Sequence, residues 1–160
     1  MPKITLILHN IRSTYNVGSI FRSAEGFGIE KIICSGYTPY PTFDGDTRLP
    51  HIADKLTKQI HKAALGAETM VPFEHYENIS SWLETNTLPL IALEQAPQSI
   101  DLRGFTPPTE LALLLGEEVD GITEDLLKQC ESIIEIPMIG EKESFNVSVA
   151  AAIALYELVS

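Results

Sequence analysis

Cysteine is almost absent from this chain, and so are long apolar runs. The 2 cysteines, Cys34 and Cys130, each lie beside an apolar run and form no C-x-x-C pair, so buried reduced thiols are favoured over a disulfide or a zinc site. The longest apolar stretches, at 111–115 and 149–155, fall far short of the roughly 20 residues that span a bilayer. The first residues have no signal-peptide pattern. We therefore expect a cytoplasmic location and no membrane anchor.

Positive charge is also scarce. The chain has 11 lysines and arginines against 22 acidic residues, which gives a formal net charge of −11 at pH 7. Such a balance repels a polyanion, so the composition by itself argues against nucleic acid as a partner. Most of the basic residues, however, lie before position 63, whereas the acids concentrate from Glu68 onward. This asymmetry fits either a basic N-terminal face on an acidic body or an ordinary solvated surface.

Short apolar stretches typical of strands alternate with stretches that have helical spacing. We expect strands at residues 4–8, 31–34, 69–71, 90–93, 111–115 and 132–136, and helices at 17–27, 56–65, 79–83, 123–130 and 147–158. This alternation predicts an α/β fold in which helices flank a parallel sheet. Residues 36–50 and 97–108 are expected to be loops. The 160 residues have the length of one domain, so we expect a single domain over 1–160.

Three polar segments each follow an expected strand, at the position where ligands bind in open α/β sheets. The first, residues 10–22, places Asn16 and Gly18 at a helix start and Arg22 further along the helix. A helix N-terminus with a nearby guanidinium suits an anion such as phosphate. The alternative is structural, with Asn16 as a helix cap and Arg22 as a surface charge.

The second and third segments combine small residues with polar ones. Residues 115–122 have two glycines, which permit a tight turn and a close ligand, and three carboxylates. Residues 136–150 place Ser144 and Asn146 before an alanine-rich stretch, which implies close packing of the helix that follows. Taken singly, each segment also fits an ordinary strand, turn and helix with a cap.

The order of the three segments resembles the SpoU family of SPOUT methyltransferases. The matching motifs are Asn-x-Gly-x-x-x-Arg at 16–22, Gly-x-Glu-x-x-Gly at 116–121, and Ile-Pro-Met at 136–138 followed by Ser-x-Asn-Val-Ser at 144–148. The resemblance covers residues 4–158, and the third motif is the most specific. One departure is Phe145, where the family often has leucine or methionine, which are also apolar. The resemblance implies the SPOUT fold, with a deep C-terminal trefoil knot that is an exception to the rule against knots.

The resemblance also implies an RNA methyltransferase that uses S-adenosyl-L-methionine (AdoMet) to methylate a ribose 2′-hydroxyl. The family's cofactor-binding positions correspond to Leu93, Gly116, Ile136, Met138 and Phe145. Its catalytic and acceptor-binding positions correspond to Asn16, Arg22, Glu118, Ser144 and Asn146, with Asn10 as a supporting residue. Arg22 is expected to act either as a base, which a guanidinium does poorly, or by stabilising the developing alkoxide and gripping a phosphate. No metal-binding spacing occurs, so metal-free chemistry is expected.

RNA is the expected partner, with tRNA favoured over ribosomal RNA and no separate RNA-binding domain. The expected contacts to RNA are Arg12, Arg48 and Lys55. The loop at 36–50 carries Tyr37, Tyr40 and Phe43, which either stack on an exposed base or anchor the loop. The resemblance also implies an obligate homodimer, since a minimal domain of this family builds its acceptor groove from two subunits, and Phe21, Val149, Ile153 and Tyr156 can form an apolar stripe for the contact.

Two other classes of function are weaker alternatives. A catalytically silent AdoMet- and RNA-binding module of the same fold has no need to retain all five residues of the catalytic set. Binding of a different nucleotide is suggested only by Gly26 and Gly28. No third glycine follows them at the dinucleotide-binding spacing, and no strand directly precedes them.

Overall fold

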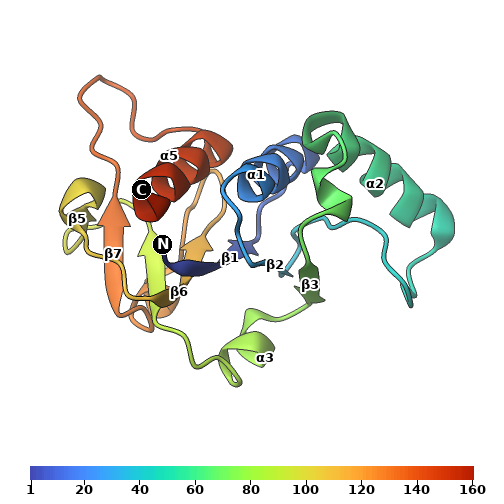
Figure 1. Ribbon diagram of the computed structural model, residues 1–160, viewed down its shortest axis with the longest axis horizontal. Helices are drawn as coiled ribbons and strands as arrows, with labels where there is room; N and C mark the ends of the chain where they lie inside the picture. The colour runs from blue at the N-terminus through green and yellow to red at the C-terminus, as the bar shows by residue number, and fades with distance from the viewer.

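The chain folds around one seven-stranded sheet, which a computed structural model describes over residues 1–160 (Figure 1). The strands lie in the order β3-β2-β1-β6-β4-β7-β5, and every neighbouring pair is parallel. The elements are β1 Lys3–His9, α1 Thr14–Gly26, β2 Lys31–Ser35, α2 Pro50–Ala64, β3 Phe73–Tyr76, α3 Ile79–Leu83, β4 Leu90–Leu93, β5 Ile100–Asp101, β6 Glu110–Leu115, α4 Glu124–Leu127, β7 Ser132–Glu135 and α5 Val147–Val159. The expected α/β fold with a helix-flanked parallel sheet is confirmed, while the knot implied by the family resemblance stays a prediction.

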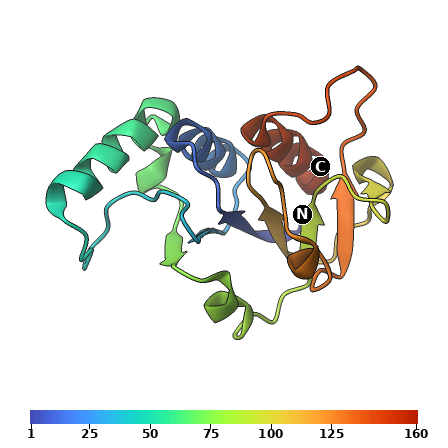
Figure 2. The same ribbon diagram turned by 180° about the vertical axis from the view of Figure 1, so that it is seen from behind.

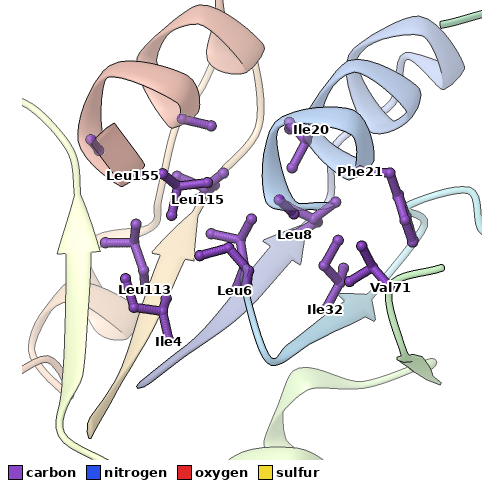
Figure 3. Close-up of a cluster of buried hydrophobic side chains, with 14 of the residues drawn as sticks. Ile4, Leu6, Leu8, Ile20, Phe21, Ile32, Val71, Leu113, Leu115 and Leu155 are labelled. Carbon is purple, nitrogen blue, oxygen red and sulfur yellow. The ribbon is translucent and has the colours of Figure 1, made fainter. Parts of the chain in front are cut away.

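Helices cover both faces of the sheet, and each face has its own apolar core. The larger core has 25 buried residues and lies between the sheet and the helices α1, α2 and α5. Figure 3 shows Leu6, Leu8 and Leu115 of the sheet beneath Ile20 of α1 and Leu155 of α5. The smaller core has 11 buried residues and lies under α3 and α4, which Figure 2 shows on the other side. The central strands are therefore apolar on both faces, as parallel strands usually are.

Close packing between α1 and α2 depends on a glycine. A side chain at Gly18 would place its Cβ 2.3 Å from the carbonyl oxygen of Ile60 on α2. The contact holds α1 in place, and α1 contains the first of the three polar motifs. The helix begins earlier than expected, because the side chain of Ser13 caps it by accepting a hydrogen bond from the backbone N–H of Asn16 at 3.1 Å. The interpretation of Asn16 as the helix cap is therefore wrong.

The region around residues 50–76 differs most from the expectation. Helix α2 begins at Pro50, a residue whose fixed φ suits the first turn of a helix. It ends where Leu65 and Gly66 adopt left-handed conformations, with φ of 52° and 104°. The expected strand at 69–71 is wrong, because a short 3₁₀ turn, Ala67–Thr69, follows and the strand is β3 instead. Helix α4 is shorter than expected, although Thr123 does cap it.

Parallel pairing places the carboxyl ends of all strands at one edge of the sheet. The loops after β1, β4, β6 and β7 therefore gather there, which is where open α/β sheets bind ligands. Cys34 is buried and Cys130 half-buried, and both are free thiols, as expected. None of the helices has the length and apolar character needed to cross a membrane.

Candidate functional site

A cavity of about 370 Å³ opens at the carboxyl edge of β4, β6 and β7. The loops that follow these strands line it, together with the start of α5. Four of the five residues expected to bind the cofactor lie in its wall, namely Leu93, Gly116, Ile136 and Phe145. Met138 is half-buried and does not line the cavity. A small residue is required at Gly116, because a Cβ there would lie 2.8 Å from the backbone carbon of Gly121.

The cavity is acidic. Six carboxylates line it and no lysine, arginine or histidine does; they are Glu94, Glu117, Glu118, Asp120, Glu135 and Glu143. A set of carboxylates around an apolar floor favours a cation and disfavours a phosphate. This charge is opposite to the one that an RNA backbone requires.

A hydrogen-bonded network joins the three polar motifs at the border of this cavity. The side-chain amide of Asn16 donates to Oε1 of Glu118 at 3.2 Å, and its Oδ1 accepts from Nδ2 of Asn146 at 3.2 Å. The partners of Asn16 are 102 and 130 residues away in the sequence. Asn16 is buried, so its amide is held in one orientation by contacts at both ends. The three motifs that sequence reasoning grouped are therefore in direct contact.

Glu118 also fixes the loop that precedes α1. Its carboxylate accepts hydrogen bonds from the backbone N–H groups of Arg12 and Ser13, each at 3.1 Å. Burial acts to raise the pKa of this carboxyl, but the donors from Arg12, Ser13 and Asn16 outweigh it and hold the pKa below its ordinary value. Glu118 is therefore ionised at neutral pH and already occupied by donors.

Asn146 has a second role as the cap of α5. Its Oδ1 accepts from the backbone N–H of Ser148 at 2.9 Å and from the hydroxyl of Ser148 at 2.6 Å. Because Oδ1 faces the helix, Nδ2 is left to donate to Asn16. The start of α5 is thus oriented by the same side chain that closes the network.

A second, shallower depression of about 520 Å³ lies beside the loop after β1, and we call it the groove. Its lining contains two arginines, three tyrosines and a histidine but no carboxylate, and includes Arg12, Tyr15, Tyr37, Tyr40, Arg48 and His75. The guanidinium of Arg12 lies 5.4 Å from the centre of the Tyr37 ring. Basic and aromatic side chains in one shallow surface suit a nucleic acid strand.

Arg48 has a structural role in the loop after β2, and its expected contact to RNA stays a prediction. Its guanidinium donates to the carboxylate of Asp46, with the closest contact at 2.7 Å, and to the carbonyl oxygens of Tyr40 and Pro41 at 3.0 and 3.1 Å. With these N–H groups engaged, Arg48 holds the loop after β2 together and has little capacity left for a phosphate. Lys55 is exposed on α2 and lies outside the groove.

Two of the three aromatic residues of the same loop pack against other rings, and the third does not. Tyr40 stacks on His75 with ring centres 3.9 Å apart, and Phe43 packs edge-on against Phe73 at 6.1 Å. These two residues therefore anchor the loop. Tyr37 is 48% exposed and Phe43 45%, but only Tyr37 makes no contact with another aromatic ring, so it is the best placed of the three to stack on a base.

Asn10 supports the groove from the end of β1. It has a left-handed backbone, with φ of 55°, and its Oδ1 accepts from the backbone N–H of Tyr37 at 3.1 Å. A Cβ at Gly36 would lie 1.8 Å from that oxygen, so the turn after β2 needs glycine. Asn10 thus positions Tyr37, and its expected support of the acceptor-binding residues stays a prediction.

Comparison with known proteins decides the family. The model of the SpoU rRNA Methylase family matches residues 3–156. The chain belongs to this family. It is 32% identical over 164 residues to the 23S rRNA (guanosine-2′-O-)-methyltransferase RlmB of Coxiella burnetii, covering 98% of this chain and 58% of that protein. The chain spans 55–58% of the length of the curated relatives that it resembles.

Solved structures of SpoU methylases share the fold. The SpoU methyltransferase AviRb from Streptomyces viridochromogenes, in complex with AdoMet, has a TM-score of 0.79 at 23% identity, covering 98% of this chain and 57% of that one. The TrmH/SpoU tRNA modifying enzyme of A. aeolicus has a TM-score of 0.76 at 21% identity, covering 99% and 75%. These similarities establish the fold of the SpoU chain described here.

Three residues of the expected catalytic set are exposed, namely Arg22, Ser144 and Asn146, and Asn146 belongs to the network described above. Arg22 is exposed on α1, lines neither the cavity nor the groove, and has no hydrogen bond or ion pair. Ser144 is exposed and lines the cavity, next to Phe145. The structure therefore brings Asn16, Glu118 and Asn146 together and leaves Arg22 apart from them.

The stripe expected at the surface of the SpoU chain is only partly present. Val149, Ile153 and Tyr156 lie along one side of α5, and Tyr156 is 64% exposed. Phe21 is fully buried and packs against Phe73 with ring centres 5.8 Å apart. The inclusion of Phe21 was wrong, because α1 turns this side chain toward the core beneath it.

Sequence reasoning missed Glu94, which lines the cavity from the end of β4. It also missed Glu135 and Glu143, which line the cavity from β7 and the loop after it. The available signal was position: Glu94 directly follows Leu93, and Glu135 directly precedes Ile136. A polar residue next to a predicted cofactor position at a strand's carboxyl end is a candidate for the same site.

Proposed function

We propose that the protein is an AdoMet-dependent RNA methyltransferase that methylates a ribose 2′-hydroxyl. The observation that supports this most strongly is the contact of Glu118, Asn16 and Asn146, which joins all three SpoU motifs at the border of the acidic cavity. The names of relatives agree with this activity: one is a guanosine-2′-O-methyltransferase, and a solved neighbour holds AdoMet.

The acidic cavity suits the cofactor. AdoMet supplies a methyl group on a positively charged sulfonium, and the carboxylates of the lining complement that charge. Gly116 lets the chain of the second motif approach a bound molecule, so the backbone of Gly116, Ile136 and Phe145, with Leu93 beside them, would hold the adenosyl part. Met138 lies outside the cavity wall, so we leave it out of this set.

The network positions the acceptor rather than removing its proton. Glu118 accepts three hydrogen bonds and has a lowered pKa, so it is a weak base that fixes the backbone of Arg12 and Ser13. Asn16 and Asn146 orient the start of α1 and α5. We assign to Arg22 the stabilisation of the developing alkoxide or of the neighbouring phosphate, because its exposed guanidinium is unpaired. Ser144 would contact the ribose at the cavity mouth.

The groove would hold the RNA next to the acceptor ribose. Arg12 and Tyr37 offer a guanidinium and an exposed ring for one unstacked nucleotide, such as a loop of a folded RNA presents. We favour tRNA as the substrate, as in the A. aeolicus neighbour named a tRNA modifying enzyme. Ribosomal RNA is the second candidate, because the RlmB relative acts on 23S rRNA by its name.

Transfer of a labelled methyl group from AdoMet tests this proposal. Deproteinised tRNA and ribosomal RNA are offered side by side, and the products are digested to nucleosides. A 2′-O-methylated nucleoside from tRNA is the expected result. Label confined to ribosomal RNA reverses the substrate preference, and label on a base overturns the mechanism. AdoMet binding without transfer to either RNA indicates the catalytically silent module.

We further propose a homodimer built through the exposed side of α5. Val149, Ile153 and Tyr156 form an apolar surface on a helix that also packs against α1, the helix of Arg22. Light scattering at micromolar concentration is expected to give twice the mass of the chain. A monomer under these conditions contradicts the proposal.

A further inference from the structure

The residue that holds the turn of the second motif comes from outside all three motifs. In the sheet, β4 lies between β6 and β7, so its end lies beside the turn that follows β6. Glu94 is the first residue after β4. Its Oε2 accepts from the backbone N–H of Ile122 and its Oε1 accepts from that of Gln95, both at 2.9 Å. The carboxylate therefore ties the 116–122 turn to the end of β4.

The turn is shaped around this carboxylate. Gly121 has a φ of 68°, in the left-handed region, and a Cβ at this position would lie 2.2 Å from Oε2 of Glu94. The backbone N–H of Gly121 donates to the carbonyl of Glu117 at 3.0 Å, which closes the turn on itself. Glu94 is held in turn by its own N–H, which donates to the carbonyl of Ile134 on β7 at 3.0 Å. At position 121, glycine is therefore required both by the backbone conformation and by the lack of space for a Cβ.

Two of the six carboxylates in the cavity wall accept hydrogen bonds from backbone N–H groups of other segments. Glu118 fixes the loop of the first motif, and Glu94 fixes the turn of the second. The side chain of Glu117 is hydrogen-bonded to Tyr37, and those of Asp120, Glu135 and Glu143 line the cavity as charged groups. Glu94 therefore differs from its neighbours by a defined structural contact to the wall of the cavity.

We propose that Glu94 is a positioning residue that sets the shape of the AdoMet cavity by fixing Gly121 and the amide of Ile122. The inference rests on the proposed function. Glu94, Gly121 and Ile122 all line the cavity, whereas none of them lines the groove. Loss of the contact should therefore weaken AdoMet binding and leave both RNA binding and the rate at saturating AdoMet nearly unchanged.

The variant Glu94→Gln keeps the length of the side chain but replaces one accepting oxygen by an NH₂ group, which then faces a backbone N–H. We expect the Kd for AdoMet, measured by calorimetry on the full chain without RNA, to rise about tenfold, as loss of a charged hydrogen bond implies. KM for AdoMet should rise in parallel and kcat should stay within about twofold. Glu135→Gln removes the same charge from the same cavity without breaking a hydrogen bond, and its Kd should rise about threefold or less.

If Glu94→Gln and Glu135→Gln lose the same affinity for AdoMet, the proposal is overturned, because loss of a negative charge alone then accounts for both changes. Amide hydrogen exchange gives a second readout: the N–H of Ile122 should exchange faster in Glu94→Gln, and unchanged exchange also contradicts the proposal. If Glu94→Gln folds poorly, Gly121→Ala replaces it, because its Cβ would displace Oε2 of Glu94. Where both single variants fold, the double variant completes a mutant cycle. The losses of AdoMet affinity in the two single variants should be strongly non-additive in the double variant, since both changes disrupt the same contact. Additive losses contradict the proposal. Absence of AdoMet binding by the unmodified chain refutes the proposed function, while the exchange of Ile122 still tests the contact.

Discussion

The cavity beside β4, β6 and β7 and the groove beside the loop after β1 have opposite charge. Six carboxylates and no basic residue line the first, whereas two arginines and no carboxylate line the second. The two surfaces meet at Glu118, whose carboxylate lines the cavity and accepts from the backbone of Arg12 and Ser13, which line the groove. A net charge of −11 therefore describes neither surface. A cation and a polyanion can be bound side by side when the charges are segregated.

The largest expected effect comes from removing Arg22, which belongs to neither surface within one chain. Arg22→Ala should reduce methyl transfer on the order of 10³-fold, since the cationic donor assigned to the developing charge is lost. The affinity for AdoMet should stay within about twofold, because Arg22 does not line the cavity. Single-turnover transfer and calorimetry measure the two quantities, with Arg103→Ala, which removes an exposed arginine paired to Asp101, as the control. Retention of most of the activity shows that the first motif is wrongly assigned.

Removing the hydrogen bonds of Asn16, at the place where the cavity and the groove meet, should have the next largest effect. Asn16→Ala removes the bonds to Glu118 and Asn146, so transfer should fall about 100-fold and the free energy of unfolding should drop by about 1–3 kcal/mol. Denaturant unfolding and initial rates measure these changes. Asn78→Ala, which removes the cap of α3, is the matched control, since it should cost about 1 kcal/mol and leave transfer intact. Equal activity of the two variants contradicts a role for the network in catalysis.

The two arginines of the groove should respond differently to substitution. Arg12→Ala should weaken RNA binding about tenfold and reduce the slope of log affinity against log salt by about 1, as expected for one phosphate contact. Arg48→Ala should instead lower the free energy of unfolding by about 1–3 kcal/mol, because its guanidinium holds Asp46, Tyr40 and Pro41. Filter binding over a salt series measures the affinity for RNA in both variants, and denaturant unfolding measures their stability. An unchanged salt slope in Arg12→Ala shows that this residue contacts no phosphate.

The smallest expected effect is the pH dependence that Glu118 contributes to stability. Its pKa is lowered in the folded chain, so the ionised form stabilises the fold at pH values above the ordinary pKa of about 4.3. That contribution is lost as the pH falls through the lowered pKa. The difference in Tm between the unmodified chain and Glu118→Gln should therefore be constant above about pH 5 and shrink below it. A difference that grows on acidification contradicts the lowered pKa.

Sequence patterns predicted the sheet and the grouping of the motifs because both depend on local signals. The apolar runs of β1 and β6 can be recognised from the sequence alone, and the second motif needs glycine for space at Gly116 and for conformation at Gly121. Residues 65–71 were misread because a left-handed turn at Leu65 and Gly66 redirects the chain, and Leu65 gives no sign of that conformation. The role of Arg48 was also out of reach, because its partners are backbone carbonyls that only the folded loop brings together.

The bond between Asn16 and Asn146 crosses 130 residues of chain. Contacts between residues so far apart in the sequence form late in folding, because the intervening chain must first lose conformational entropy. A chain still being synthesised can build the strands up to β6, yet it has no partner for Asn16 until α5 has emerged and docked. The contact between Asn16 and Asn146 therefore forms only after the sheet has assembled and α5 has docked on it. Partly folded chains lack the hydrogen bond that joins the first motif to the third.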